Sequence, residues 1–204
     1  MKTIESQQKN LQKILDVLST EGVIVCPTDT VYGLLADATN KKAVKKVFQI
    51  KKRSSKKPFP VFVKDIEMAG KLAIINKKQL KFLKKFWPGK VTVVLRATEE
   101  AKKMLAKGII GEDNKIGLRI PDYKLVNKIL GEFKKPLTAT SANISGELAI
   151  IDIKDVISSF SGQKLQPDLA INEGKLKESE PSTVIDLSAS RPKILREGAL
   201  KLKL

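Results

Sequence analysis

The apolar and polar residues of this chain follow two spacings in turn. Residues 6–20 repeat apolar side chains every three or four positions, which predicts an amphipathic helix. Residues 22–26 (GVIVC) form a short β-branched run that Pro27 ends, and this predicts a buried strand. Residues 40–50 return to the helical spacing behind Asn40, a residue type that caps helices. Helix and strand therefore alternate from the start of the chain.

The same alternation continues to the C-terminal region, with no long linker, repeat or low-complexity tract. It predicts an α/β fold with a mixed sheet, and one domain over residues 1–204. Further strands are predicted at residues 60–63, 91–95, 116–120, 168–171, 183–187 and 194–196, and further helices after Asp65, at residues 77–86 and 99–106, and from a cap at Asp122 through Leu130.

Composition narrows the class of protein. Of the 204 residues, 42% are hydrophobic and 30% are charged, the balance of a soluble globular protein. No run approaches the roughly 18 apolar residues of a membrane span, so we expect a cytoplasmic protein. Cys26 is the single cysteine, which excludes an intrachain disulfide and predicts a buried packing role.

The chain contains no histidine. This excludes Ser-His-Asp and Cys-His catalysis and every zinc site that needs imidazole, and one cysteine cannot form a thiolate site. No metal ligand set is therefore predicted. Chemistry must use Lys, Arg, Ser, Thr, carboxylates and backbone groups.

The net charge is +17, which favours anionic partners such as nucleotides or nucleic acid, although a solvated lysine-rich surface explains it equally well. Lysine supplies 34 of the 39 basic residues. An arginine in such a chain indicates a position that needs a planar, two-pronged donor for carboxylate or phosphate. The five arginines are Arg53, Arg96, Arg119, Arg191 and Arg196.

Four polar clusters lie at the predicted ends of strands or helices, where an open α/β sheet builds its site. They are residues 27–34 (PTDTVYGL), 51–58 (KKRSSKKP), 141–146 (SANISG) and 182–186 (STVID), with Arg196 ten residues beyond the last. Each cluster alone also fits a turn, a solvated loop or a helix cap. The chain has neither a GxxxxGK[ST] loop nor a GxGxxG turn, so a P-loop or Rossmann nucleotide site is not expected.

These clusters, together with FWPGKVT, IGLRIP and ILREG, resemble the YrdC/Sua5 family of threonylcarbamoyl-AMP synthases in order and approximate spacing. The resemblance implies a twisted, open, mixed sheet with flanking helices and a concave basic face. It implies an enzyme, a nucleotidyltransferase that joins L-threonine, bicarbonate and ATP into threonylcarbamoyl-AMP and pyrophosphate. The product supplies tRNA threonylcarbamoyladenosine (t6A) modification through a separate transferase complex, and Mg²⁺ is expected on the phosphates.

The resemblance also implies roles for individual residues. Lys51 and Arg53 are the catalytic candidates. Threonine is expected at Thr30, Arg119, Ser141 and Ser182, and the nucleotide at Lys51, Arg53, Lys57, Asn143 and Arg196. Three positions depart from the pattern: Phe62 replaces a frequent His, Lys115 a frequent Thr, and Pro181 an acidic residue.

Two other functions remain open at this point. The basic face of the same fold could bind double-stranded RNA, tRNA or ribosome precursors through phosphate contacts without catalysis. A paralogue could also use the same pocket for a different small substrate, which Phe62 and Lys115 keep open.

Overall fold

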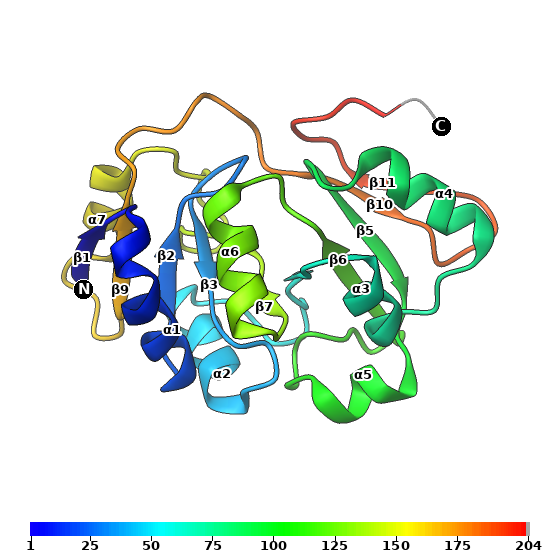
Figure 1. Ribbon diagram of the computed structural model, residues 1–204, viewed down its shortest axis with the longest axis horizontal. Coiled ribbons are helices and arrows are strands. Elements are labelled where there is room, and N and C mark those ends of the chain that lie inside the picture. The colour runs from blue at the N-terminus through cyan, green and yellow to red at the C-terminus, as the bar shows by residue number, and fades with distance from the viewer. Residues whose placement is uncertain (203–204) are drawn as a thin grey trace.

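A computed structural model describes residues 1–202 as two mixed β-sheets with helices packed on them (Figure 1). Sheet A has the order β1 (Lys2–Glu5), β9 (Leu169–Asn172), β2 (Ile24–Cys26), β3 (Gly33–Leu35) and β8 (Thr140–Ser141). Sheet B has the order β11 (Lys193–Arg196), β10 (Thr183–Asp186), β5 (Val91–Arg96), β6 (Lys115–Arg119), β4 (Val61–Phe62) and β7 (Leu137–Thr138).

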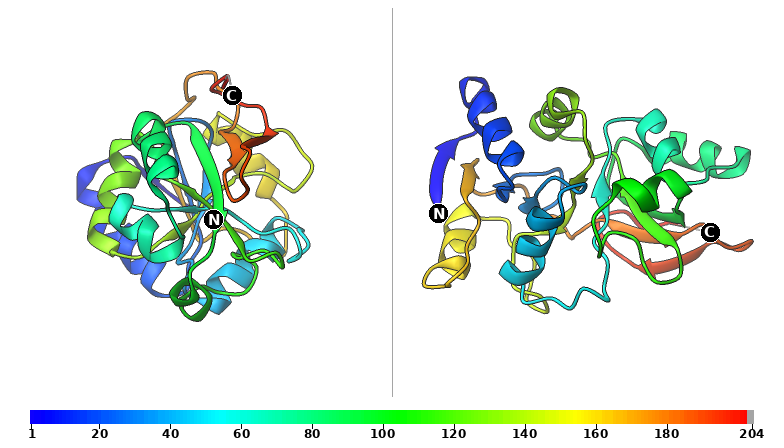
Figure 2. Two further views of the ribbon diagram at one scale, coloured as in Figure 1. Left: turned by 90° about the vertical axis from the view of Figure 1, so that its right-hand side faces the viewer. Right: turned by 90° about the horizontal axis from the view of Figure 1, so that it is seen from below.

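The α/β class is confirmed, but the strands divide between two mixed sheets where the sequence predicted one. The division lies in residues 137–141. β7 pairs with β4 of sheet B, whereas β8, which starts two residues after β7 ends, pairs with β3 of sheet A. Between them, the backbone N–H of Ala139 donates to the carbonyl of Pro60. This short segment therefore joins the sheets. Figure 2 shows the whole molecule from two further directions.

Seven α-helices surround the sheets in the described part of the chain, most of them where the apolar spacing predicted a helix. Side chains of Asn40, Asp65 and Asn76 accept backbone hydrogen bonds at helix starts, as their residue types favour. The helices are α1 (Leu11–Ser19), α2 (Lys41–Ile50), α3 (Ile66–Leu72), α4 (Lys77–Phe86), α5 (Glu99–Met104), α6 (Lys124–Phe133) and α7 (Ile153–Phe160), with a 3-10 turn at Gln8–Asn10.

The helices cover both faces of sheet A. Ile24 and Cys26 of β2 pack in one apolar cluster with side chains of α1 and α6, whereas Val23 and Val25 pack in another that includes α2 and α7. This alternation follows from the two-residue repeat of a strand. Cys26 is fully buried in this core, which confirms its packing role, and burial raises the pKa of its thiol.

Sheet B has one covered face and one open face. Val91, Val93 and Leu95 of β5 lie in the core with apolar side chains of α3, α4 and α5. Thr92 and Val94, which alternate with them, line a cavity on the other face. The strand repeat therefore fixes which residues of sheet B can meet a ligand.

Several local predictions were wrong or incomplete. Asp122 does not cap α6: the N-cap residue is Tyr123, without a side-chain hydrogen bond, and the Asp122 N–H donates to Asp29. Strands β1 and β3 and helix α7 were not predicted at all. Trp87 is buried in the core and donates its ring N–H to the Val91 carbonyl, as a packing role requires.

No helix within residues 1–202 is long and apolar enough to span a bilayer. Residues 203–204, which lie outside the described part, belong to the predicted single domain. That domain assignment stays a prediction.

Candidate active site

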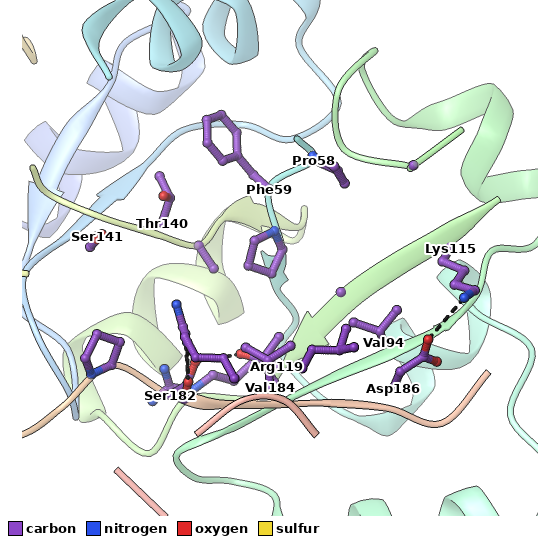
Figure 3. Close-up of a pocket in the computed structure, with 18 of the residues that line it drawn as sticks. Pro58, Phe59, Val94, Lys115, Arg119, Thr140, Ser141, Ser182, Val184 and Asp186 are labelled. Atoms are coloured by element: carbon purple, nitrogen blue, oxygen red, sulfur yellow. Dashed lines mark hydrogen bonds and ion pairs between the residues drawn. The ribbon is translucent and has the colours of Figure 1, made fainter. Parts of the chain in front are cut away.

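The open face of sheet B and the facing loops of sheet A enclose a cavity of about 890 Å³ (Figure 3). Its lining carries more lysine and arginine than aspartate and glutamate, in agreement with the expected basic face. Six sequence-predicted residues from distant parts of the chain line it together: Thr30, Arg53, Arg119, Ser141, Ser182 and Arg196.

Arg119 is the most enclosed cation of the cavity. Its Nη2 donates to Asp29 Oδ1 at 2.5 Å, and the two side chains are only 4% and 7% exposed. Its Nε donates to the Gly89 carbonyl at 2.8 Å, and its Nη1 to Thr30 Oγ1 at 3.3 Å. A guanidinium has five N–H groups, so one on each Nη is left for a ligand. Asp29 acts as a hydrogen-bond acceptor for Arg119 and for the backbone N–H of Asp122.

The segment after β2 presents hydroxyls beside Arg119. Thr28 Oγ1 lies 3.1 Å from Thr30 Oγ1, accepts the Thr30 backbone N–H and donates to the Val31 carbonyl at 2.7 Å. These local bonds fold the polar residues after Pro27 into a compact turn. The turn directs the Thr30 hydroxyl toward the guanidinium of Arg119.

Arg53 lies at the mouth of the cavity on the loop after α2. Its Nε donates to the Lys57 carbonyl at 3.0 Å and its Nη2 to the Pro58 carbonyl at 3.3 Å. Its guanidinium carbon lies 5.1 Å from the ring centre of Phe59, which in turn stacks on Phe48 at 4.1 Å. Arg53 is thus held by carbonyls and a ring, and among the described residues it has no carboxylate partner.

Arg196, at the end of β11, lines the same cavity and is also held by a carbonyl. Its Nη2 and Nε donate to the Ser182 carbonyl at 2.7 and 3.1 Å, and Nη2 also lies 3.3 Å from Ser182 Oγ. Ser182 Oγ lies 2.8 Å from Thr92 Oγ1, so β10 and β5 join the arginine to the open face of sheet B. Thr92 was missed at sequence level, although it is the polar residue of the strand VTVVL.

The three arginines share one electrostatic field. Burial lowers the pKa of Arg196, and the positive charges of Arg119 and Arg53 lower it further. Arginine nonetheless remains protonated in proteins. The cavity therefore concentrates positive charge, and an anion placed there relieves the mutual repulsion.

Lys51 does not line the cavity but holds one of its loops. It is buried, and its Nζ donates to the carbonyls of Ser141 and Asn143 at 2.6 and 2.8 Å and to Asn143 Oδ1 at 2.9 Å. Burial lowers its pKa to about 7, the charge of Arg53 lowers it too, and Glu147 acts in the opposite direction. Lys51 therefore fixes Ser141, which does line the cavity.

Asn143 and Lys57 also lie outside the cavity lining. Asn143 Oδ1 accepts from Ser141 Oγ at 2.7 Å, and its Nδ2 donates to the carbonyls of Glu147 and Leu148. The Lys57 side chain is exposed, whereas its neighbour Lys56 lines the cavity and was not predicted. Direct substrate contact by Lys51, Lys57 and Asn143 stays a prediction.

Carboxylates that could bind a metal are scarce around this cavity. Within residues 1–202 no group of three or more His, Cys, Asp or Glu side chains is arranged to hold a metal ion. The two most enclosed acids, Asp29 and Asp186, already pair with Arg119 and Lys115. A divalent cation that takes part here fits best as a companion of phosphate groups.

Comparison with known proteins assigns the family. The family model for Sua5, YciO and YrdC domains, described as telomere recombination, matches residues 16–198. The chain belongs to this family. A Methanocaldococcus jannaschii protein is 35% identical to it over 207 residues, covering 100% of this chain and 94% of that protein.

Two comparisons with Pyrococcus abyssi link the family to an activity and a ligand. Its threonylcarbamoyl-AMP synthase is 33% identical over 185 residues, covering 90% of this chain and 52% of that protein. A crystal structure of Pyrococcus abyssi Sua5 complexed with L-threonine has a TM-score of 0.86 and 29% identity, covering 97% of this chain and 56% of that one. The chain spans about half the length of these relatives.

Proposed function

We propose that this protein is a threonylcarbamoyl-AMP synthase, a nucleotidyltransferase that makes L-threonylcarbamoyladenylate for the t6A modification of tRNA. The main support is that three arginines line one cavity together with three of its hydroxyl side chains. The arginines are Arg53, Arg119 and Arg196, and the hydroxyls belong to Thr30, Ser141 and Ser182. The family membership and the synthase named among the relatives support the same reaction. Such a set of hydrogen-bond donors suits substrates that carry carboxylate or phosphate groups.

The Arg119 end suits the amino acid. One N–H on each Nη of Arg119 is left to pair with a carboxylate, while Thr30 and Ser182 offer hydroxyls to a small polar side chain. Ser141, across the cavity, is fixed by its hydrogen bond to Asn143.

The mouth suits the phosphates. Arg53 and Arg196 keep their positive charge without a carboxylate partner among the described residues, and Lys56 adds a flexible cation. ATP enters as its magnesium complex, and the metal is a companion of the substrate in this proposal. The arginines then bear the charge of the α-phosphate and of the departing pyrophosphate.

The reaction follows in two bond-forming steps. The threonine nitrogen bonds to the carbon supplied by bicarbonate, which loses water and leaves an N-carboxylate. An oxygen of that carboxylate attacks the α-phosphorus, and the bond to the bridging oxygen breaks as pyrophosphate leaves with the electron pair. Neither step needs an imidazole: alignment and charge stabilisation by fixed donors are what the cavity supplies.

The decisive experiment measures pyrophosphate release from ATP with and without threonine and bicarbonate. Release should require both, and mass spectrometry should find threonylcarbamoyl-AMP. Equal release without threonine would contradict the proposal and favour a plain ATPase or a paralogue with another substrate. Because the adenylate is an activated acyl donor, we further expect a separate transferase complex to consume it.

A second candidate function, RNA binding, rests on a groove that adjoins this cavity and shares Arg53 with it. The groove is lined by basic side chains of α2 and neighbouring loops over Phe48: Lys41, Lys45, Lys52, Arg53 and Lys107. Binding of double-stranded RNA or tRNA there would weaken steeply with salt, with a log–log slope of about −0.7 to −0.9 per neutralised phosphate. Lys45→Ala should then reduce RNA binding while pyrophosphate release is unchanged.

A further inference from the structure

The strand that carries Arg196 is irregular at the position of this arginine. β11 is the edge strand of sheet B and lies beside β10 (Figure 1). Ile185 pairs with Ile194 but Val184 pairs with Arg196, so Leu195 is the extra residue of a β-bulge. Successive side chains of a regular strand point to opposite faces, yet Leu195 and Arg196 both line the cavity. The bulge therefore turns Arg196 toward the cavity.

The guanidinium of Arg196 is tied to the backbone at the start of β10. Its Nε and Nη2 both donate to the Ser182 carbonyl. In the proposed synthase, Ser182 faces threonine and Arg196 faces the phosphates of ATP. This pair of hydrogen bonds therefore links the binding groups of two substrates that must react with each other.

Two residues after Arg196, the backbone passes close to the same end of β10. A Cβ added at Gly198 would lie 2.2 Å from the Pro181 carbonyl oxygen and 2.9 Å from the Ser182 carbonyl oxygen. The backbone N–H of Ala199 donates to the Pro181 carbonyl at 2.9 Å. Glycine leaves room for this approach, which gives the last residue of the ILREG motif a structural reason.

A buried hydroxyl on β10 holds the next residue of this segment. Thr183 is 1% exposed, and its Oγ1 donates to the Leu200 carbonyl and accepts the Leu200 backbone N–H at 3.2 Å. Thr183 is not part of the cavity lining, because it alternates along the strand with Ser182 and Val184, which are. Thr183 can therefore act on a substrate only through the segment that it holds.

Three successive residues, Pro181, Ser182 and Thr183, thus each bond to the segment of residues 196–200. Together these contacts fix an edge strand in place and set the position of Arg196 relative to Ser182. A reaction between two bound substrates depends on such alignment, since a displacement of about 1 Å costs roughly a hundredfold in rate.

We propose that Thr183 and Gly198 are positioning residues of the proposed synthase, on which this inference rests. They hold residues 198–200 against the start of β10, and this contact keeps Arg196 where the carboxylate formed on threonine meets the α-phosphorus. Neither residue carries a charge or touches a substrate. Their loss therefore slows the reaction of the bound substrates, while each substrate still binds.

Thr183→Val tests the proposal, because valine has the shape of threonine but forms neither bond to Leu200. At saturating threonine, bicarbonate and ATP, kcat for pyrophosphate release should fall about tenfold or more. Calorimetry should show separate affinities for threonine and ATP within about threefold of the wild type. Thr183→Ser restores the hydroxyl and should return kcat to within about twofold of the wild type.

Thr98→Val is the matched control. The Thr98 hydroxyl also donates to a carbonyl, that of Lys71, and accepts a backbone N–H, that of Ala101, at the start of α5 outside the cavity. This variant should lower the melting temperature with kcat unchanged. Gly198→Ala displaces the same segment as Thr183→Val and should reproduce its loss of kcat, so it carries the test independently of whether the valine variant folds.

The outcomes separate this inference from the proposed function. Folded Thr183→Val and Gly198→Ala with wild-type kcat, a loss of substrate affinity as large as the loss of kcat, or no recovery in Thr183→Ser would each overturn the positioning role and leave the synthase standing. A wild-type protein without threonine-dependent pyrophosphate release contradicts the proposed function itself. Amide hydrogen exchange at Ala199 and Leu200 tests the contact without turnover: Thr183→Val should speed it and Thr98→Val should not.

Discussion

Arg119 and Arg53 line one cavity, yet their surroundings differ in what neutralises them. Arg119 lies deep, with Asp29 as a buried counter-charge. Arg53 lies half-buried at the mouth, held by the carbonyls of Lys57 and Pro58. Carbonyl oxygens orient a guanidinium without cancelling its charge, whereas a carboxylate does both. The deep site therefore provides oriented hydrogen-bond donors with little net charge, which suits a weakly charged ligand. The mouth provides net positive charge, which suits a polyanion.

The largest effect should follow from removal of the buried counter-charge. Asp29→Asn leaves Arg119 charged and unpaired in the interior, which costs about 3–5 kcal/mol of unfolding free energy. Urea unfolding at neutral pH measures this loss. The double variant Asp29→Asn with Arg119→Met should recover part of it, because no buried charge is left.

A matched surface control is Glu99→Gln, which breaks the exposed pair with Lys102. Exposed pairs contribute about 0–1 kcal/mol, so this variant should change stability little. Equal stability losses for the two variants would mean that Asp29 acts by packing alone.

The next largest effect should be on ligand affinity, and it should differ between the two arginines. Arg119→Lys and Arg53→Lys keep the charge but lose the planar pair of donors, which removes a charge-assisted hydrogen bond of about 1.5–3 kcal/mol. Calorimetry should show that Arg119→Lys weakens threonine binding about tenfold or more and that Arg53→Lys does the same for ATP.

Arg191→Lys is the control for both, because Arg191 is exposed and outside the cavity lining. It should change neither affinity. If Arg119→Lys disturbs ATP alone, the ends of the cavity are assigned the wrong way round. If all three variants behave alike, positive charge is sufficient for binding and the planar pair of donors of the guanidinium has no role.

How far the sequence could predict the site depends on whether a residue's partners are local or distant in the chain. The family resemblance, which rests on local motifs, pointed to Thr30, Arg119, Ser141 and Ser182, and the structure brings all four to one cavity. Partners from another part of the chain, such as Thr92 for Ser182, depend on strand register, which no local pattern contains. Lys51 illustrates the limit: the motif identified the residue, but only the packing of residues 141–143 around its ammonium showed that it holds a loop.

The fold shows a similar division between local and non-local information. Long periodic segments such as α2 and α4 were predicted because apolar spacing and capping residues are local. Strands β1 and β3 were missed because their residues become strands only through pairing, β1 with β9 and β3 with β2 and β8. The split of residues 137–141 between two sheets likewise depends on partners far away in sequence.

A pH effect should distinguish Lys51 from both arginines, which do not titrate. Burial lowers the pKa of Lys51 to about 7 from its ordinary 10.5, so between pH 7 and 9 the unfolded chain binds a proton that the native protein does not. Stability should therefore rise with pH in this window, by up to about 1.4 kcal/mol per unit. Lys51→Met should flatten this slope in urea unfolding, whereas Lys52→Met, at an exposed neighbour, should not. Equal slopes in the wild type and Lys51→Met would refute the assignment.

The smallest effect concerns the ring beneath Arg53. Phe59→Leu keeps an apolar side chain but removes the cation–π contact at 5.1 Å, which is worth about 0.5–1 kcal/mol at a partly exposed site. Because this contact orients Arg53 toward the mouth, its loss should weaken ATP binding about two- to fivefold, while threonine binding at Arg119 is unaffected. Phe133→Leu is the matched control, since Lys135 lies 5.4 Å from the Phe133 ring outside the cavity. Calorimetry at constant salt should show a change in ATP affinity for the first variant only. A parallel loss of threonine affinity in Phe59→Leu would instead mean that the ring supports the whole cavity, and the independence of its two ends would fail.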